Sequence, residues 1–104
     1  MEFQRAFETA YRARTDGPAI VAVAARTTLR VQAGQAWVPP APGTRLLQAI
    51  GIEPHPGTLG LLVNAVHDPV VAIVYARDRR DPSLPEVGLA GWRDAPELAG
   101  FRPR

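Results

Sequence analysis

The N-terminal segment alternates apolar and polar residues with the period of an α-helix. A spacing of i, i+4, i+7 and i+8 gathers four apolar side chains on one helical face: Phe3, Phe7, Ala10 and Tyr11. Residues 16–18, with the sequence DGP, then stop the helix. We predict a helix whose apolar face packs on the sheet of its own domain. The alternative is a helix that docks on another subunit.

The pattern then changes to that of strands. Residues 19–24 (AIVAVA) are continuously apolar, which is typical of a strand covered on both faces. Residues 28–32 alternate between apolar and polar side chains, which predicts a hairpin partner with one solvated face. Residues 36–38 (AWV) predict a brief third strand that carries Trp37.

A proline-rich stretch separates this strand from a second helix. Residues 39–43 (PPAPG) are predicted to form a spacer in the polyproline II conformation, because proline cannot donate ladder hydrogen bonds. Residues 44–51 (TRLLQAIG) then predict a short helix. Thr44 is placed to cap its start, and Gly51 is placed to end it in a left-handed conformation.

Two further strands are predicted at residues 58–64 and 69–76. Gly60 interrupts the first, which indicates a close approach of another group to the backbone. The second is apolar on both faces, so we expect it to lie at the centre of the sheet. Its charged neighbours, such as Asp68 and Arg77, lie at its two ends and not within it. They are therefore interpreted as the polar ends of a buried strand and not as an active site.

The C-terminal part combines a long polar loop with a closing helix. Residues 77–88 form the loop, and residues 92–101 are predicted to form a small helix. Asp94 and Glu97 have the spacing of a capping box at its start. Three side chains of this helix are expected to pack back on the core: Trp92, Leu98 and Phe101.

These elements predict an α+β fold for a single domain at residues 1–104. A mainly antiparallel sheet of about five strands packs against the N-terminal helix, and two further short helices complete it. The length of 104 residues is close to the commonest domain size, and 46% hydrophobic with 21% charged residues is typical of a globular protein.

Composition narrows the classes of function. The chain has no cysteine, which excludes disulfides, thiolate metal sites and cysteine nucleophiles. All twelve basic residues are arginine, but they are spread along the chain and the net charge is only +2, which does not favour a nucleic-acid partner. No apolar stretch approaches the roughly 20 residues of a membrane span. We expect a cytoplasmic location, or an envelope location if the natural protein carries a leader or anchor outside this chain.

Catalytic and metal-binding patterns are weak. His55, His67 and Asp68 are proper zinc ligands by type, but a strand at residues 58–64 lies between the histidines. At about 3.3 Å per residue, that strand separates its ends by roughly 23 Å, too far for one ion. Ser83 has neither a glycine elbow nor a histidine near it in sequence. We therefore predict no catalytic, cofactor-binding or metal-binding residues, and no cofactor.

Several stretches in order match one known pattern: AIVAVAARTTLRVQAGQAWVPP, TRLLQAIG, TLGLLVN, VVAIVYARD and LAGWRDAPEL. Together, over residues 20–98, they resemble a bacterial family of membrane-anchored proteins of unknown function. The resemblance implies a noncatalytic, β-rich α+β module. It assigns no functional residues.

The function predicted from these observations is a noncatalytic protein–protein interaction or assembly module. The candidate interaction residues are Trp37, Tyr75, Arg77 and Trp92. Tryptophan and tyrosine are favoured interface anchors, although each of these three aromatic residues could instead pack in the core. A homodimer could form through the N-terminal helix or through an exposed sheet edge.

Two alternatives stay open. The first is a small-molecule-binding protein or minor enzyme that uses residues 78–86, in which case a pocket lined by Tyr75, Arg77 and Trp92 is expected. The second is an accessory, immunity or virion-assembly protein of a mobile element, which predicts a dedicated protein partner.

Overall fold

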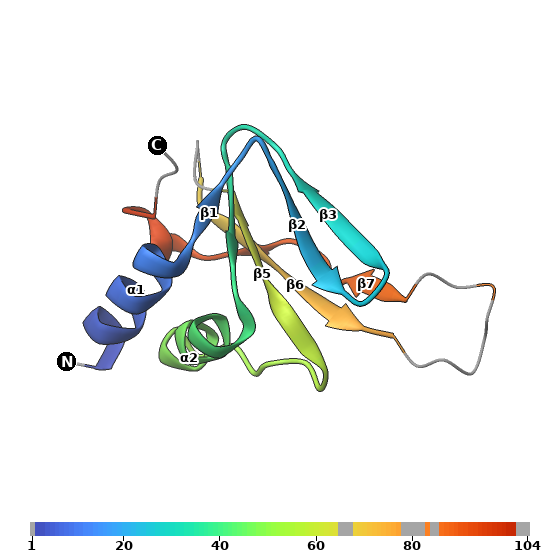
Figure 1. Cartoon of the computed structure of the whole chain (residues 1–104). Coiled ribbons are helices and arrows are strands. Elements are labelled where there is room, and N and C mark those ends of the chain that lie inside the picture. The colour runs from blue at the N-terminus through green and yellow to red at the C-terminus, as the bar shows by residue number, and fades with distance from the viewer. Residues whose placement is uncertain (1, 65–67, 78–82, 84–85, 102–104) are drawn as a thin grey trace.

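The computed structural model describes residues 2–64, 68–77, 83 and 86–101. Two α-helices, eight strands and one 3-10 helix are present within this part of the chain. In chain order the elements are α1 (Glu2–Ala13), β1 (Thr15–Asp16), β2 (Ala19–Ala24), β3 (Thr27–Val31), β4 (Gln35–Val38), α2 (Pro40–Ala49), β5 (Thr58–Asn64), β6 (Val70–Ala76), β7 (Val87–Leu89), β8 (Arg93–Asp94) and η1 (Pro96–Leu98). The predicted α+β fold is confirmed (Figure 1).

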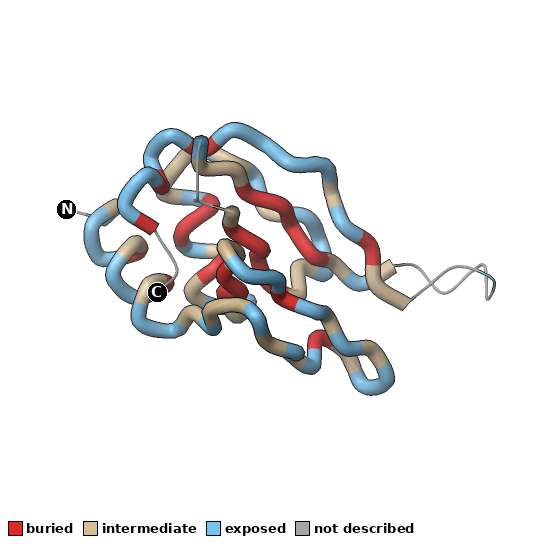
Figure 2. The backbone as a smooth tube through the Cα atoms, turned by 90° about the horizontal axis from the view of Figure 1, so that it is seen from above, coloured by how far each residue is buried: buried red, intermediate tan, exposed pale blue. Residues whose placement is uncertain are grey.

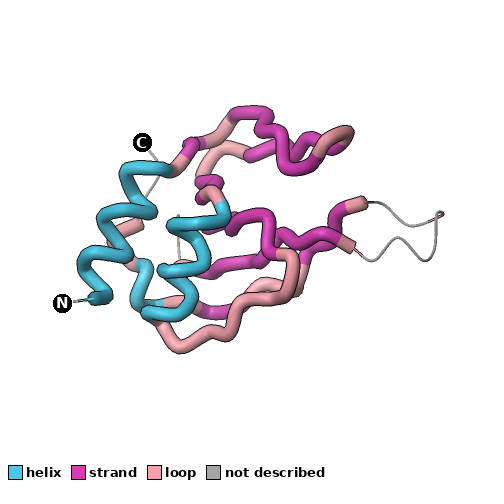
Figure 3. The backbone as a smooth tube through the Cα atoms, turned by 60° about the horizontal axis from the view of Figure 1, so that its bottom comes forward, coloured by secondary structure: helices cyan, strands magenta, loops and turns pink. Residues whose placement is uncertain are grey.

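The main sheet is antiparallel and has the strand order β1-β4-β5-β6-β7, with β8 also paired to β6. Strand β6 pairs with β5 on one side and with β7 and β8 on the other, so it is an interior strand, although β5 occupies the middle of the strand order. Hairpin β2–β3 forms a separate two-stranded sheet. Figure 3 shows this hairpin as a separate layer, away from helices α1 and α2, which lie next to each other.

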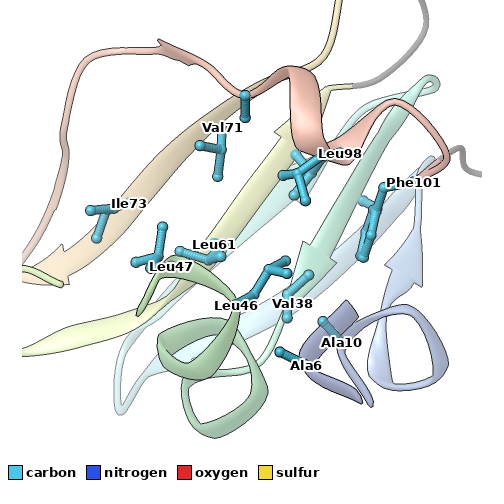
Figure 4. Close-up of a cluster of buried hydrophobic side chains, with 13 residues drawn as sticks. Ala6, Ala10, Val38, Leu46, Leu47, Leu61, Val71, Ile73, Leu98 and Phe101 are labelled. Carbon is cyan, nitrogen blue, oxygen red and sulfur yellow. The ribbon is translucent and has the colours of Figure 1, made fainter. Parts of the chain in front are cut away.

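Side chains alternate between the two faces of the main sheet and build two cores. On one face, strand residues pack with the helices and the C-terminal segment (Figure 4); the buried members of this core are Ala6, Ala10, Ala36, Val38, Leu46, Leu47, Leu61, Val63, Val71, Ile73, Ala95, Leu98 and Phe101. On the other face, the hairpin packs on the sheet through Val23, Val31, Trp37, Leu62 and Val74. Figure 2 shows buried residues concentrated along the central strands.

Helix α1 uses its predicted apolar face within its own domain. Ala6 and Ala10 are buried, and Phe7 and Tyr11 meet the ring of Phe101 edge to face at centroid distances of 5.4 and 5.5 Å. The C-terminal segment is thus held against the N-terminal helix by aromatic contacts, which contribute beyond their buried area. No described helix is long and apolar enough to cross a lipid bilayer.

The prediction that residues 19–24 are covered on both faces is wrong. Burial alternates along β2, and Ile20 is 67% exposed. The strand belongs to a two-stranded ribbon, which packs one face on the main sheet and has no described layer over the other. The predicted hairpin with β3 is confirmed.

The prediction of a polyproline spacer at residues 39–43 is also wrong, because α2 begins at Pro40. Pro39 is the extended residue before the helix, and the first helical hydrogen bond runs from the N–H of Gly43 to the carbonyl of Pro39 at 2.9 Å. The earlier N–H groups of a first turn have no helical partner, so proline costs nothing there. Thr44 therefore lies inside the helix and caps nothing, whereas Gly51 follows it at φ +80° as predicted.

The predicted closing helix is shorter than expected, and its capping box is absent. Asp94 lies in β8 opposite Val70, and the residue before η1 is Ala95, which makes no side-chain cap. Since Asp94 is part of the strand pairing, only one 3-10 turn follows. Leu98 and Phe101 are fully buried as predicted. Trp92 does not pack back and is 43% exposed.

Candidate interaction surface

Residues 87–94, which we call the edge segment, form one outer edge of the main sheet. Its first part, β7, pairs Gly88 with Tyr75, and its last part, β8, pairs Arg93 with Val71. The sequence pattern placed the start of this segment in a loop. A three-residue strand with a glycine at its centre is too short to show a periodic pattern, so β7 could not be recognised in advance.

The hydrogen bonds to β6 determine which groups of the edge segment face outward. The N–H of Arg77 donates to the carbonyl of Glu86 at 2.8 Å, and the N–H of Ala90 donates to the carbonyl of Ile73 at 2.9 Å. In an antiparallel ladder, alternate residues turn their main-chain groups toward the neighbouring strand. Val87 and Leu89 therefore direct their N–H and carbonyl groups away from β6, to the outside of the sheet.

The edge segment contains one β-bulge. Ala90 donates to Ile73, and Arg93 pairs with Val71, so three steps along the edge match two steps along β6. The extra residue lies in the stretch that contains Trp92. Bulges end regular pairing at a sheet edge and redirect a side chain, which fits the exposure of Trp92.

Large exposed hydrophobic side chains are concentrated on this segment. Within the described part of the chain they are Ile20, Leu89 and Trp92, at 67%, 49% and 43% exposure. Leu89 and Trp92 lie three residues apart on the edge segment, whereas Ile20 lies on hairpin β2–β3. Leu89 was not among the residues predicted from the sequence, because its exposure depends on its position at the end of the sheet.

Tyr75 has a structural role in the sheet. A Cβ atom at Gly88, its cross-strand partner, would lie 2.6 Å from Cζ of Tyr75, so the ring lies directly over the glycine. The ring of His55 stacks on Tyr75 with a centroid distance of 4.0 Å. An aromatic ring that covers a glycine at a sheet edge stabilises the pairing of the two strands.

Arg77 lies beside Tyr75 at the end of β6. Its Nε atom is buried, has no hydrogen-bond partner within the described part of the chain, and would lie 2.9 Å from a Cβ at Gly88. The structure thus brings Tyr75 and Arg77 together at Gly88. Trp92 is four residues further along the edge segment, beyond the bulge, and neither of the two described cavities is lined by any of these three residues.

Trp37 is a core residue. It is 6% exposed and packs on Leu62 and Val74 on the hairpin face of the sheet. Its ring occupies the space where Gly60 lacks a side chain, which confirms the predicted close approach at that glycine. Trp37 is therefore too buried to serve as a contact residue for a partner, and it packs in the core instead.

The residues considered for catalysis are only partly described. His67 lies outside the described residues, so the predicted separation of the two histidines stays a prediction. The described residues contain no group of three or more histidine, aspartate or glutamate side chains that could hold a metal ion. The loop at residues 78–86 also lies largely outside them.

Comparisons of the chain with protein-family models, with curated proteins and with solved structures found no match. The resemblance to a membrane-anchored family therefore stays a prediction. The fold and the edge segment are the basis for a functional proposal.

Proposed function

We propose that the chain is a noncatalytic protein-interaction module that binds a protein partner along the edge segment. The observation that supports this most directly is the coincidence of two features there. Val87 and Leu89 have outward-facing main-chain groups. The same segment exposes two large apolar side chains, those of Leu89 and of Trp92 three residues further on. Exposed edges pair readily with another strand, and tryptophan is enriched among interface anchors.

Packing within the domain favours the edge over the N-terminal helix. Of the two routes to association expected from the sequence, α1 has already used its apolar face, since Phe3, Phe7 and Tyr11 pack against the core of the same chain. The edge segment, by contrast, retains outward-facing main-chain groups together with two exposed apolar side chains.

The proposed mode of binding is strand addition at β7. An extended partner segment would exchange hydrogen bonds with Val87 and Leu89 and would cover the side chain of Leu89. The bulge ends the regular ladder before Trp92, so Trp92 would meet side chains of the partner and not its backbone. A second copy of the chain could supply the same segment through a twofold axis, which would give a homodimer.

The experiment combines light scattering on the pure protein with affinity capture from the native host. Three variants are compared with the wild type. Leu89→Pro removes an outward N–H that makes no bond to β6, and Trp92→Ala removes the larger apolar side chain. Ile20→Ser is the matched control, because it removes an exposed apolar side chain from the hairpin.

We expect one stoichiometric protein partner, or a dimer, that both edge variants weaken and the control does not. Loss of the Trp92 side chain should weaken binding about thirtyfold or more, since anchors of this kind contribute about 2 kcal/mol or more. A monomer without a stoichiometric partner would contradict the proposal, as would a partner retained by both edge variants or lost from the Ile20→Ser variant.

A further inference from the structure

A cavity of about 440 Å³ lies between helices α1 and α2, away from the edge segment. Figures 1 and 3 both show the two helices side by side. The cavity is lined by Glu2, Arg5, Ala6 and Thr9 of α1 and by Arg45, Gln48 and Ala49 of α2. Each set follows the i, i+3, i+4 spacing of one helical face, so the two faces oppose each other across the cavity.

Small residues bring the two helices close together. Ala6 is buried and Ala49 is half-buried against the core, so the floor of the cavity consists of methyl groups. Gly43 is also buried, and a Cβ there would lie 3.0 Å from Leu61 of β5, so its absence lets α2 approach the sheet. The other lining residues have longer side chains, are solvent-exposed and form the rim of the cavity.

The charged groups of the rim are not neutralised within the described residues. Neither Arg5 nor Arg45 has a hydrogen bond or ion pair there, and Glu2 pairs with neither of them. Two guanidinium groups and one carboxylate leave the cavity with one net positive charge. Thr9 and Gln48 add a hydroxyl and an amide that can donate to the same ligand.

We propose that this cavity binds a small organic anion through a carboxylate or phosphate group held by Arg5 and Arg45. The planar guanidinium matches both oxyanions with two parallel hydrogen bonds, and such charge-assisted bonds are the strong ones. The volume falls within the roughly 300–1,000 Å³ range of small-molecule sites. The alanine floor receives the apolar part of the ligand, and Glu2 receives a donor group at its other end.

A second cavity of similar volume provides an internal contrast. It lies along α1 and is lined by Phe3, Gln4, Phe7, Glu8, Glu97 and Gly100. Its two carboxylates and the absence of a cation among these residues make it unsuited to an anion. Anion binding is therefore expected on only one side of α1.

The experiment is a titration of the isotopically labelled full chain followed by NMR. The probes are inorganic phosphate and succinate, each compared with chloride at equal ionic strength. The variants are Arg5→Gln and Arg45→Gln, and Arg30→Gln is the matched control, because Arg30 is an exposed arginine on β3. Circular dichroism and thermal unfolding verify that each variant is folded.

With at least one probe, we expect saturable shifts at the backbone amides of Arg5, Thr9 and Gln48. Each cavity variant should weaken binding about tenfold or more, whereas Arg30→Gln leaves it unchanged. Tighter binding of phosphate identifies a phosphate ester as the ligand class, and tighter binding of succinate identifies a carboxylic acid. The proposal is overturned if both probes act only as chloride does, if the shifts lie elsewhere, or if the three variants bind equally.

Discussion

Substitution of Gly60 by alanine tests how Trp37 is held in the core. A Cβ at this position would overlap Cζ2 and Cη2 of Trp37 and would lie 2.6 Å from the carbonyl oxygen of Val38. The φ of Gly60 is +154°, which side-chain-bearing residues rarely adopt. Neither obstacle yields easily, because the indole is enclosed and the carbonyl belongs to the β4 backbone.

Two other glycines allow the strain and the overlap to be measured separately. Gly51 has φ +80° and Gly91 has no positive φ, and a Cβ would meet nothing within 4 Å at either position. Gly91→Ala should change the free energy of unfolding by about 0.5 kcal/mol or less. Gly51→Ala should cost about 1 kcal/mol from backbone strain, net of the lower entropy of the unfolded chain. Gly60→Ala adds overpacking of about 1–3 kcal/mol to strain of about 1–3 kcal/mol, for a total of about 2–6 kcal/mol.

The assay is equilibrium urea unfolding of the three variants, with the midpoint and the slope m fitted separately. A stability difference shifts the midpoint at constant m, so a change in m would indicate a different unfolded or native state. Stability changes at two independent sites can be compared to within about 0.5 kcal/mol. If the loss of unfolding free energy in Gly60→Ala equals that in Gly51→Ala within this uncertainty, the tight packing of Trp37 on Gly60 is refuted.

Three other predictions concern the aromatic contacts. Phe101→Ala should destabilise the chain by about 3–5 kcal/mol in urea unfolding, because it removes a fully buried ring; a cost under about 1 kcal/mol would contradict this. The guanidinium of Arg14 lies 3.6 Å from the centroid of the Tyr11 ring, and its side chain is 8% exposed. Arg14→Lys should therefore lower the thermal midpoint, because lysine lacks the planar group that stacks on the ring; an unchanged midpoint would argue against the contact. Acrylamide should quench Trp92 more strongly than Trp37, measured in single-tryptophan variants; equal quenching would disprove their different burial.

Local patterns were sufficient for the elements that are long and regular. Helix α1 and strand β3 were predicted from periodicity, and strands β2, β5 and β6 were predicted from apolar stretches of strand length. The roles of Gly51 and Gly60 were also predicted. Glycine is the residue that most readily ends a helix in a left-handed conformation, and within an apolar strand it leaves room for a neighbouring group.

The proposed interaction surface was only partly predictable. Trp92 was named, but with an expectation of packing, and Leu89 was not named at all. Trp37 and Trp92 are the same residue type in short apolar stretches, yet one is enclosed and the other is exposed. Trp37 is enclosed because hairpin β2–β3 packs over that face of the sheet, whereas Trp92 lies between β7 and β8 at the edge of the sheet. Both positions are properties of the tertiary structure.

The amino-acid sequence by itself determined the secondary structure of the long segments, the α+β class and the sites of special backbone conformation. Those features depend on residues close together in the chain. Only the tertiary structure decided that residues 19–31 form a separate layer, that Pro40 begins a helix, and that residues 87–94 close one edge of the sheet. These outcomes depend on contacts between distant segments, whose burial and hydrogen bonding outweigh weak local preferences.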